Sequence, residues 1–140
     1  MVNWFVLAVI AAVSFGIMVV LIKITLTKGL NSVLLTTYLF TFTTIFLWIY
    51  VALTQKIIIP STSISILILI TALVAVIANL TLFKSYNLVS NPSYTHAVGS
   101  ISVIVAFLLS IFIFNLRPDL ISIIGIMLII GGTVLLARVV

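Results

Sequence analysis

The chain has 140 residues, of which 65% are hydrophobic and 5% are charged, and its formal net charge is +5. A soluble domain carries about 25% charged residues, so this composition, with a mean hydropathy of +1.59, predicts an integral membrane protein. The absence of cysteine and the presence of a single acidic residue, Asp119, exclude a disulfide framework, a thiolate metal site and a carboxylate pair.

Charged residues and turn residues divide the chain into five apolar segments. A helix needs about 20 apolar residues to cross roughly 30 Å of hydrocarbon, and each segment is close to that length. The first segment is not a typical secretory signal, because Met1-Val2-Asn3 lacks a basic region and the apolar run continues to about Ile22. We predict helices over residues 4–26, 31–53, 64–88, 94–114 and 120–137.

Capping residues mark the limits of these helices. Lys28-Gly29 resembles a basic last turn followed by a C-cap glycine, and Asn31 can cap the second helix. In the break before the fourth helix, Asn91 or Ser90 can serve as the cap, and Arg117-Pro118-Asp119 forms a tight turn before the fifth helix. Because every backbone group in lipid must be paired within its own segment, apolar runs of this length are helices. The predicted fold is therefore an all-α integral membrane fold of five transmembrane helices with short loops, in a single domain spanning residues 1–140.

The six basic residues stand singly near the ends of the apolar segments. This placement is typical of side chains that reach lipid headgroups, so we expect Lys23 and Lys84 to be such anchors and expect no nucleic-acid partner. If the N-terminus lies in the cytoplasm, Lys56 and Arg117 are inside and the other four basic residues are outside. The opposite orientation is only weakly favoured by the positive-inside rule, and dual insertion stays open.

Small residues recur at helical spacing in three of the segments. Gly125 and Gly132 lie seven residues apart on one face of the fifth helix, where missing side chains permit close backbone contact in lipid. We expect these two glycines to form a subunit interface, with internal packing as the alternative. Similar spacings in the first helix (Ala8, Ala12) and the third are interpreted as internal packing.

Polar residues at depth are the candidates for a substrate pathway. Asn79 must either hydrogen-bond a neighbouring helix or face a cavity, and both readings stay open. His96, Gly99 and Ser100 share a narrow stripe of the fourth helix. His96 is either an interfacial residue bonded to a carbonyl or headgroup, or a pathway residue that carries protons.

Other polar residues in the spans are expected to be satisfied locally. Thr37, Thr41 and Thr44 follow one face of the second helix and are expected to bond the carbonyl four residues earlier. One aspartate in a loop and one histidine near a helix end provide no nucleophile–base set and no metal cluster. We therefore expect no enzyme activity, no metal and no cofactor.

The segments resemble the drug/metabolite transporter superfamily, specifically one five-helix unit of its EamA-type branch, which larger members carry in tandem. The resemblance covers the whole chain and is clearest in AVIAAVSFGIMVVLIKITL, with its Ser14-Phe15-Gly16 step and Lys23, and in FNLRPDLISIIGIMLIIGGTVLL. The two glycines of the fifth helix are similar to those that mediate dimerisation in the small multidrug resistance branch. The chain departs from that branch because it contains no glutamate, which argues against carboxylate-based antiport of cationic drugs.

The resemblance implies a multi-pass transporter, most simply in the cell membrane, that works as a dimer with itself or with a related five-helix subunit. Without an acidic residue in the spans, we expect the small-molecule substrate to be neutral or zwitterionic. The expected pathway near the midplane involves Ser14, Asn79, His96 and Ser100. The alternatives are a non-transporting membrane subunit and a subunit of a flippase for lipid-linked sugars.

Overall fold

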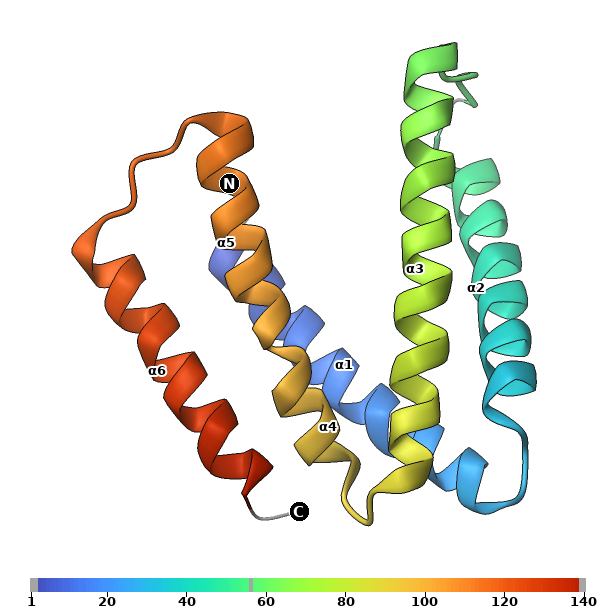
Figure 1. The fold of residues 1–140 in the computed structure, drawn as a ribbon. Coiled ribbons are helices and arrows are strands. Elements are labelled where there is room, and N and C mark those ends of the chain that lie inside the picture. Colours follow the sequence, from blue (N-terminus) through green and yellow to red (C-terminus); the bar gives the residue numbers. More distant parts are fainter. Residues whose placement is uncertain (1–2, 56, 139–140) are drawn as a thin grey trace. The chain divides into compact units, whose positions relative to one another are not determined.

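The computed structural model describes residues 3–55 and 57–138, and all regular secondary structure in that part of the chain is α-helical (Figure 1). Lys56, which enters the charge count above, lies outside the described residues. The helices are α1 (Trp4–Thr27), α2 (Ser32–Thr54), α3 (Thr62–Leu88), α4 (Pro92–Gly99), α5 (Ile101–Phe114) and α6 (Leu120–Ala137).

Five apolar segments are present, as the sequence predicts. The helices α1, α2 and α3 and the segment Pro92–Phe114 are long and apolar enough to cross a membrane, and Leu120–Leu136 is a shorter apolar helix. The prediction of an all-α fold with five helical segments for a multi-pass membrane protein is confirmed.

Side chains just before the helices satisfy backbone amides that lack an intrahelical partner. The side-chain oxygens of Asn3, Asn31 and Asn91 accept from the amide two residues later, at 3.0, 2.8 and 3.0 Å. The Asp119 carboxylate accepts from the Ser122 amide at 2.7 Å and so begins α6. Short polar side chains in extended backbone therefore set where four of the helices begin.

Two residues with positive φ follow helix ends. Gly29, with φ 91°, turns the chain after the C-cap Lys28, and its amide donates to the Leu26 carbonyl at 3.0 Å. Asn115, with φ 50°, ends α5 in the left-handed region that asparagine tolerates better than most residues. The positive φ at these two positions lets the chain turn directly after α1 and after α5.

The fourth apolar segment is interrupted at Ser100, which differs from the continuous helix that the sequence predicts. The Ser100 amide donates to the Ala97 carbonyl and the Val103 amide donates to the Ser100 carbonyl, both at 3.0 Å and both three residues apart. The Ser100 hydroxyl also donates to the Ala97 carbonyl at 2.5 Å. A hydroxyl that competes for a backbone carbonyl beside a glycine is a known cause of helix irregularity, and Gly99 directly precedes it.

The chain forms two compact units, which are described separately: unit 1 ends at Leu88 and unit 2 begins at Val89. In unit 1, α2 and α3 run side by side, and α1 meets them near one end (Figure 1). The core of unit 1 lies at that end and consists of Val19, Ile22, Leu26, Leu35, Phe83 and Tyr86. We call this region, built from the last turns of α1 and α3 and the first turns of α2, the packed end of unit 1.

In unit 2, α4 and α5 both contact α6. The most buried polar residue of this unit is Thr133 of α6, with 7% of its surface exposed. Its hydroxyl donates to the Ile129 carbonyl at 2.8 Å and lies 3.3 Å from the Ser100 hydroxyl. The break between α4 and α5 therefore faces α6.

Candidate functional site

The predicted pathway residues of unit 1, Ser14 and Asn79, are bonded within their own helices. The Ser14 hydroxyl donates to the Ile10 carbonyl at 2.8 Å on the exposed first half of α1. The Asn79 amide group donates to the Ala75 carbonyl at 2.8 Å and is partly buried on α3. This local bond was not among the two readings offered by the sequence, and a role for either residue in transport stays a prediction.

The predicted pathway residues of unit 2 lie near the break in the fourth span. His96 is exposed in the last turn of α4, and Ser100 lies partly buried at the junction with α5. Eight residues of α4 place this junction roughly 12 Å from the start of the span, well inside the hydrocarbon. Ser100 has a neighbour that sequence reasoning missed, the Thr133 hydroxyl at 3.3 Å.

Thr133 directly follows Gly131 and Gly132, and the sequence interpretation of this part of the helix considered only its glycines. A signal was available, since a hydroxyl at this depth in a span must find an acceptor. Thr133 meets that need within α6, as Thr37 and Thr41 do within α2 by donating to Val33 and Thr37 carbonyls at 3.0 and 2.9 Å. For Thr37 and Thr41 the predicted local bonds are confirmed.

Lys23 makes a contact between helices that the sequence did not indicate, and its expected role as an anchor at lipid headgroups stays a prediction. Its ammonium donates to the backbone carbonyl of Tyr86 at 2.7 Å, so a side chain of α1 binds the main chain of α3. Tyr86 has 1% of its surface exposed, and its ring stacks on Phe83 with centroids 6.1 Å apart. The ammonium therefore lies beside the apolar cluster at the packed end of unit 1.

The glycine face of α6 is open. A Cβ atom added at Gly125 or Gly132 would have no neighbouring atom within 4 Å. Internal packing of the described structure therefore gives no reason for a glycine at either position. The predicted role of these residues in holding two subunits together stays a prediction.

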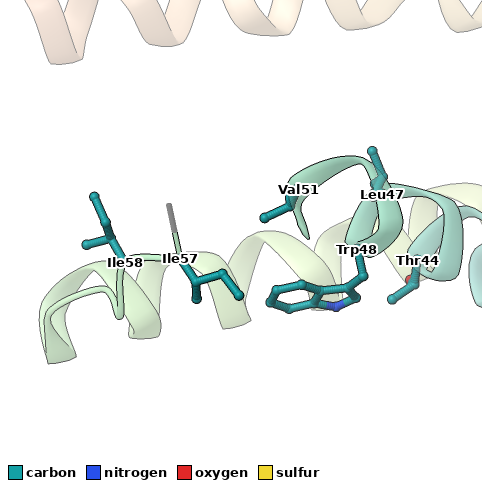
Figure 2. Close-up of a pocket in the computed structure, with 6 residues that line it drawn as sticks. All are labelled: Thr44, Leu47, Trp48, Val51, Ile57 and Ile58. Atoms are coloured by element: carbon teal, nitrogen blue, oxygen red, sulfur yellow. The ribbon is translucent and has the colours of Figure 1, made fainter. Parts of the chain in front are cut away.

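Unit 1 has an apolar hollow of about 470 Å³ at the opposite end from the packed end, where α2 finishes. Figure 2 shows the Trp48 ring between Thr44 and Ile57 in this hollow. Leu47, Val51 and Ile58 complete the lining. Trp48 lies near the end of α2, and a tryptophan at such a position is typical of the membrane interface.

Unit 2 has a hollow of about 400 Å³ where α5, the following loop and α6 meet. Arg117 and Asp119 are among its lining residues. The Ser122 hydroxyl, and after it the Ser122 amide, hold the pKa of the Asp119 carboxyl below its ordinary value. The one acidic residue of the chain is therefore an ionised cap of α6 outside the spans.

The described residues can also be searched for clusters of metal-ligating side chains. Among them, no three His, Asp or Glu side chains come together as a metal site would require. The polar groups named above on the helices are hydroxyls, one amide, one imidazole and one ammonium, and the Arg117 guanidinium and the Asp119 carboxylate lie in the loop before α6. Their arrangement along apolar helices is typical of a membrane protein that handles small molecules.

Comparisons with known proteins agree with this description. Neither the curated proteins nor the solved structures include a significant match to this chain. The profile of the EamA-like transporter family matches residues 2–138, almost the full length of the chain. With five apolar helical segments and this match, the chain belongs to the EamA-like transporter family.

Proposed function

We propose that this chain is one subunit of a dimeric transporter that moves a small neutral or zwitterionic metabolite across the membrane. The observation that carries the proposal is the family match over nearly the whole chain, together with its apolar spans. A single subunit of five helices with short loops has too few helices to surround a substrate path. A second copy or a related subunit supplies the missing wall.

The open glycine face of α6 supports the dimer. Gly125 and Gly132 have free space where a side chain would stand, and helices in lipid associate through such backbone-exposing faces. Among the described residues of unit 2, no neighbouring atom lies within 4 Å of a Cβ atom added at either position.

The inventory of charges supports the substrate class. Asp119, the sole acidic residue, is bonded at the cap of α6, so a cationic drug would find no carboxylate within the spans. Hydroxyls and amides both donate and accept hydrogen bonds, so they suit neutral and zwitterionic groups. A neutral or zwitterionic metabolite fits this set better than a cation.

Flux into liposomes reconstituted with the purified protein alone tests the proposal. Panels of radiolabelled amino acids, polyols and sugars are offered under counterflow, with protein-free liposomes as the control. We expect saturable uptake of at least one neutral or zwitterionic compound and no uptake of the lipophilic cation tetraphenylphosphonium.

Two outcomes would contradict the proposal in different ways. Uptake of tetraphenylphosphonium with no zwitterion uptake would overturn the substrate class. Uptake that appears only after a second membrane protein is added would assign this chain the role of a non-transporting subunit.

A further inference from the structure

The contact between Lys23 and Tyr86 joins two helices at their corresponding ends. Lys23 lies four residues before the end of α1, and Tyr86 lies two residues before the end of α3. The 2.7 Å separation of the ammonium nitrogen and the carbonyl oxygen is that of a short, charge-assisted hydrogen bond.

The Tyr86 carbonyl is a suitable acceptor because of its place in α3. The last four carbonyls of a helix have no intrahelical amide to bind, and they carry the negative end of the helix dipole. The Lys23 bond therefore places a cation where the helix dipole favours one. Unit 1 contains no acidic residue, so helix-end carbonyls supply negative potential that a carboxylate would otherwise provide.

The bond is partly buried and lies among apolar side chains. Val19, Ile22 and Leu26 of α1 flank Lys23, and each has less than a tenth of its surface exposed. On α3, Phe83 and Tyr86 are almost completely buried. Apolar surroundings strengthen a hydrogen bond, because fewer water molecules compete for the donor and the acceptor.

The opposite end of unit 1 has no comparable contacts. On the first half of α1, Val6, Ile10 and Val13 each expose about half of their surface, with values of 49, 58 and 59%. Within the described residues of unit 1, the buried positions are confined to the packed end. The buried contacts among the three helices are therefore concentrated at one end of unit 1.

We propose that Lys23 is a positioning residue that keeps the packed end of unit 1 closed to water by binding the last turn of α3. A transporter must open and close each side of the membrane in turn, and an ammonium–carbonyl bond can break without leaving a pair of opposite charges apart in lipid. The inference rests on the proposed transport function only where it interprets the closed end as one side of a transport path. The closure is a property of the chain that can be measured without a substrate.

The test uses the absence of native cysteine, which allows single probes to be placed. Leu82, partly buried against the cluster, is replaced by cysteine, and the rate of its labelling by a charged maleimide is measured in phosphatidylcholine nanodiscs, where both faces are accessible. In a second background, spin labels at the exposed positions Thr27 and Asn87 report the distance between the ends of α1 and α3. Each background carries Lys23→Met, Lys23→Gln or Lys23→Arg.

Lys84→Gln is the matched control, because Lys84 is an exposed lysine in the same region of α3. We expect Lys23→Met and Lys23→Gln to raise the labelling rate roughly tenfold or more, as the loss of a charge-assisted bond predicts, and to broaden the distance distribution. Lys23→Arg, which keeps charge and donors, and Lys84→Gln should both behave like the parent.

The inference is overturned if Lys23→Met and Lys23→Gln leave both measurements at the parent values, because the apolar cluster then closes this end alone. It is also overturned if Lys84→Gln accelerates labelling as much as Lys23→Met. Circular dichroism and gel filtration identify folded variants, and Lys23→Gln decides the matter if Lys23→Met does not fold. A parent protein that shows this closure but no flux would refute the proposed function and leave the role of Lys23 standing.

Discussion

The contact between Ser100 and Thr133 in unit 2 is weaker than its burial suggests. A hydroxyl has one proton to donate, and each of these two hydroxyls already donates to a carbonyl of its own segment, at 2.5 and 2.8 Å. Their mutual separation of 3.3 Å is longer than the 2.7–2.8 Å usual for bonded hydroxyls. The two oxygens therefore meet mainly as acceptors.

A double-mutant cycle measures this contact. Side-chain hydrogen bonds between membrane helices average about 0.6 kcal/mol, so we expect the coupling energy of Ser100→Ala with Thr133→Val to be below about 0.5 kcal/mol. The free energies of unfolding are obtained by titration with dodecyl sulfate in bicelles. Ser110→Ala is the control, because the Ser110 hydroxyl makes a similar bond of 2.7 Å to the Ala106 carbonyl.

A coupling energy above about 1.5 kcal/mol, near the largest value for such bonds, would refute this reasoning. It would mean that one hydroxyl gives its proton to the other and that its own carbonyl bond is secondary. The break between α4 and α5 would then be held from α6 rather than arising within its own segment.

Three further predictions follow from the sites described. Leucine at both Gly125 and Gly132 should convert crosslinked dimer to monomer in detergent, and an unchanged crosslinking pattern would remove the glycine face from the interface. Asp119→Ala should speed amide exchange in the first turn of α6, whereas Asp119→Asn should not. Because the pKa of this carboxyl is lowered in the folded protein, its charge stabilises the fold above its ordinary pKa. That contribution should be constant from about pH 5 to 8 and lost in stronger acid. Asn79→Leu should reduce flux in folded protein, and His96→Ala should abolish any pH dependence of flux. Full flux with the pH response intact would assign both residues to packing.

The helix limits could be predicted from the sequence because they depend on local chemistry. Asn31, Asn91 and Asp119 accept from nearby amides as their positions suggested, and Gly29 adopts the positive φ expected of a glycine after a helix. Each of these interactions joins residues within three positions of each other. The length of each apolar segment then predicted that it is helical, because lipid leaves a long apolar segment no alternative to a helix.

Features that join distant residues could not be predicted in the same way. Lys23 and Tyr86 are 63 residues apart, and no pattern in α1 indicates which carbonyl lies beside its last turn. The interruption at Ser100 was also missed, because Gly99 and Ser100 were interpreted as a polar stripe on a regular helix. The sequence shows which groups need a partner, and only packing determines which partner they find.

Most polar side chains of the spans differ from Lys23 in one respect that bears on transport. Ser14, Thr37 and Asn79 are satisfied by carbonyls of their own helices, so these bonds survive when one helix moves against another. The same groups can accept a bond from a passing substrate without loss of a contact between helices. The Lys23 bond joins α1 to α3, so it must break if those helices separate. Local bonds therefore leave the helices free to move, and the ammonium opposes that movement at one end.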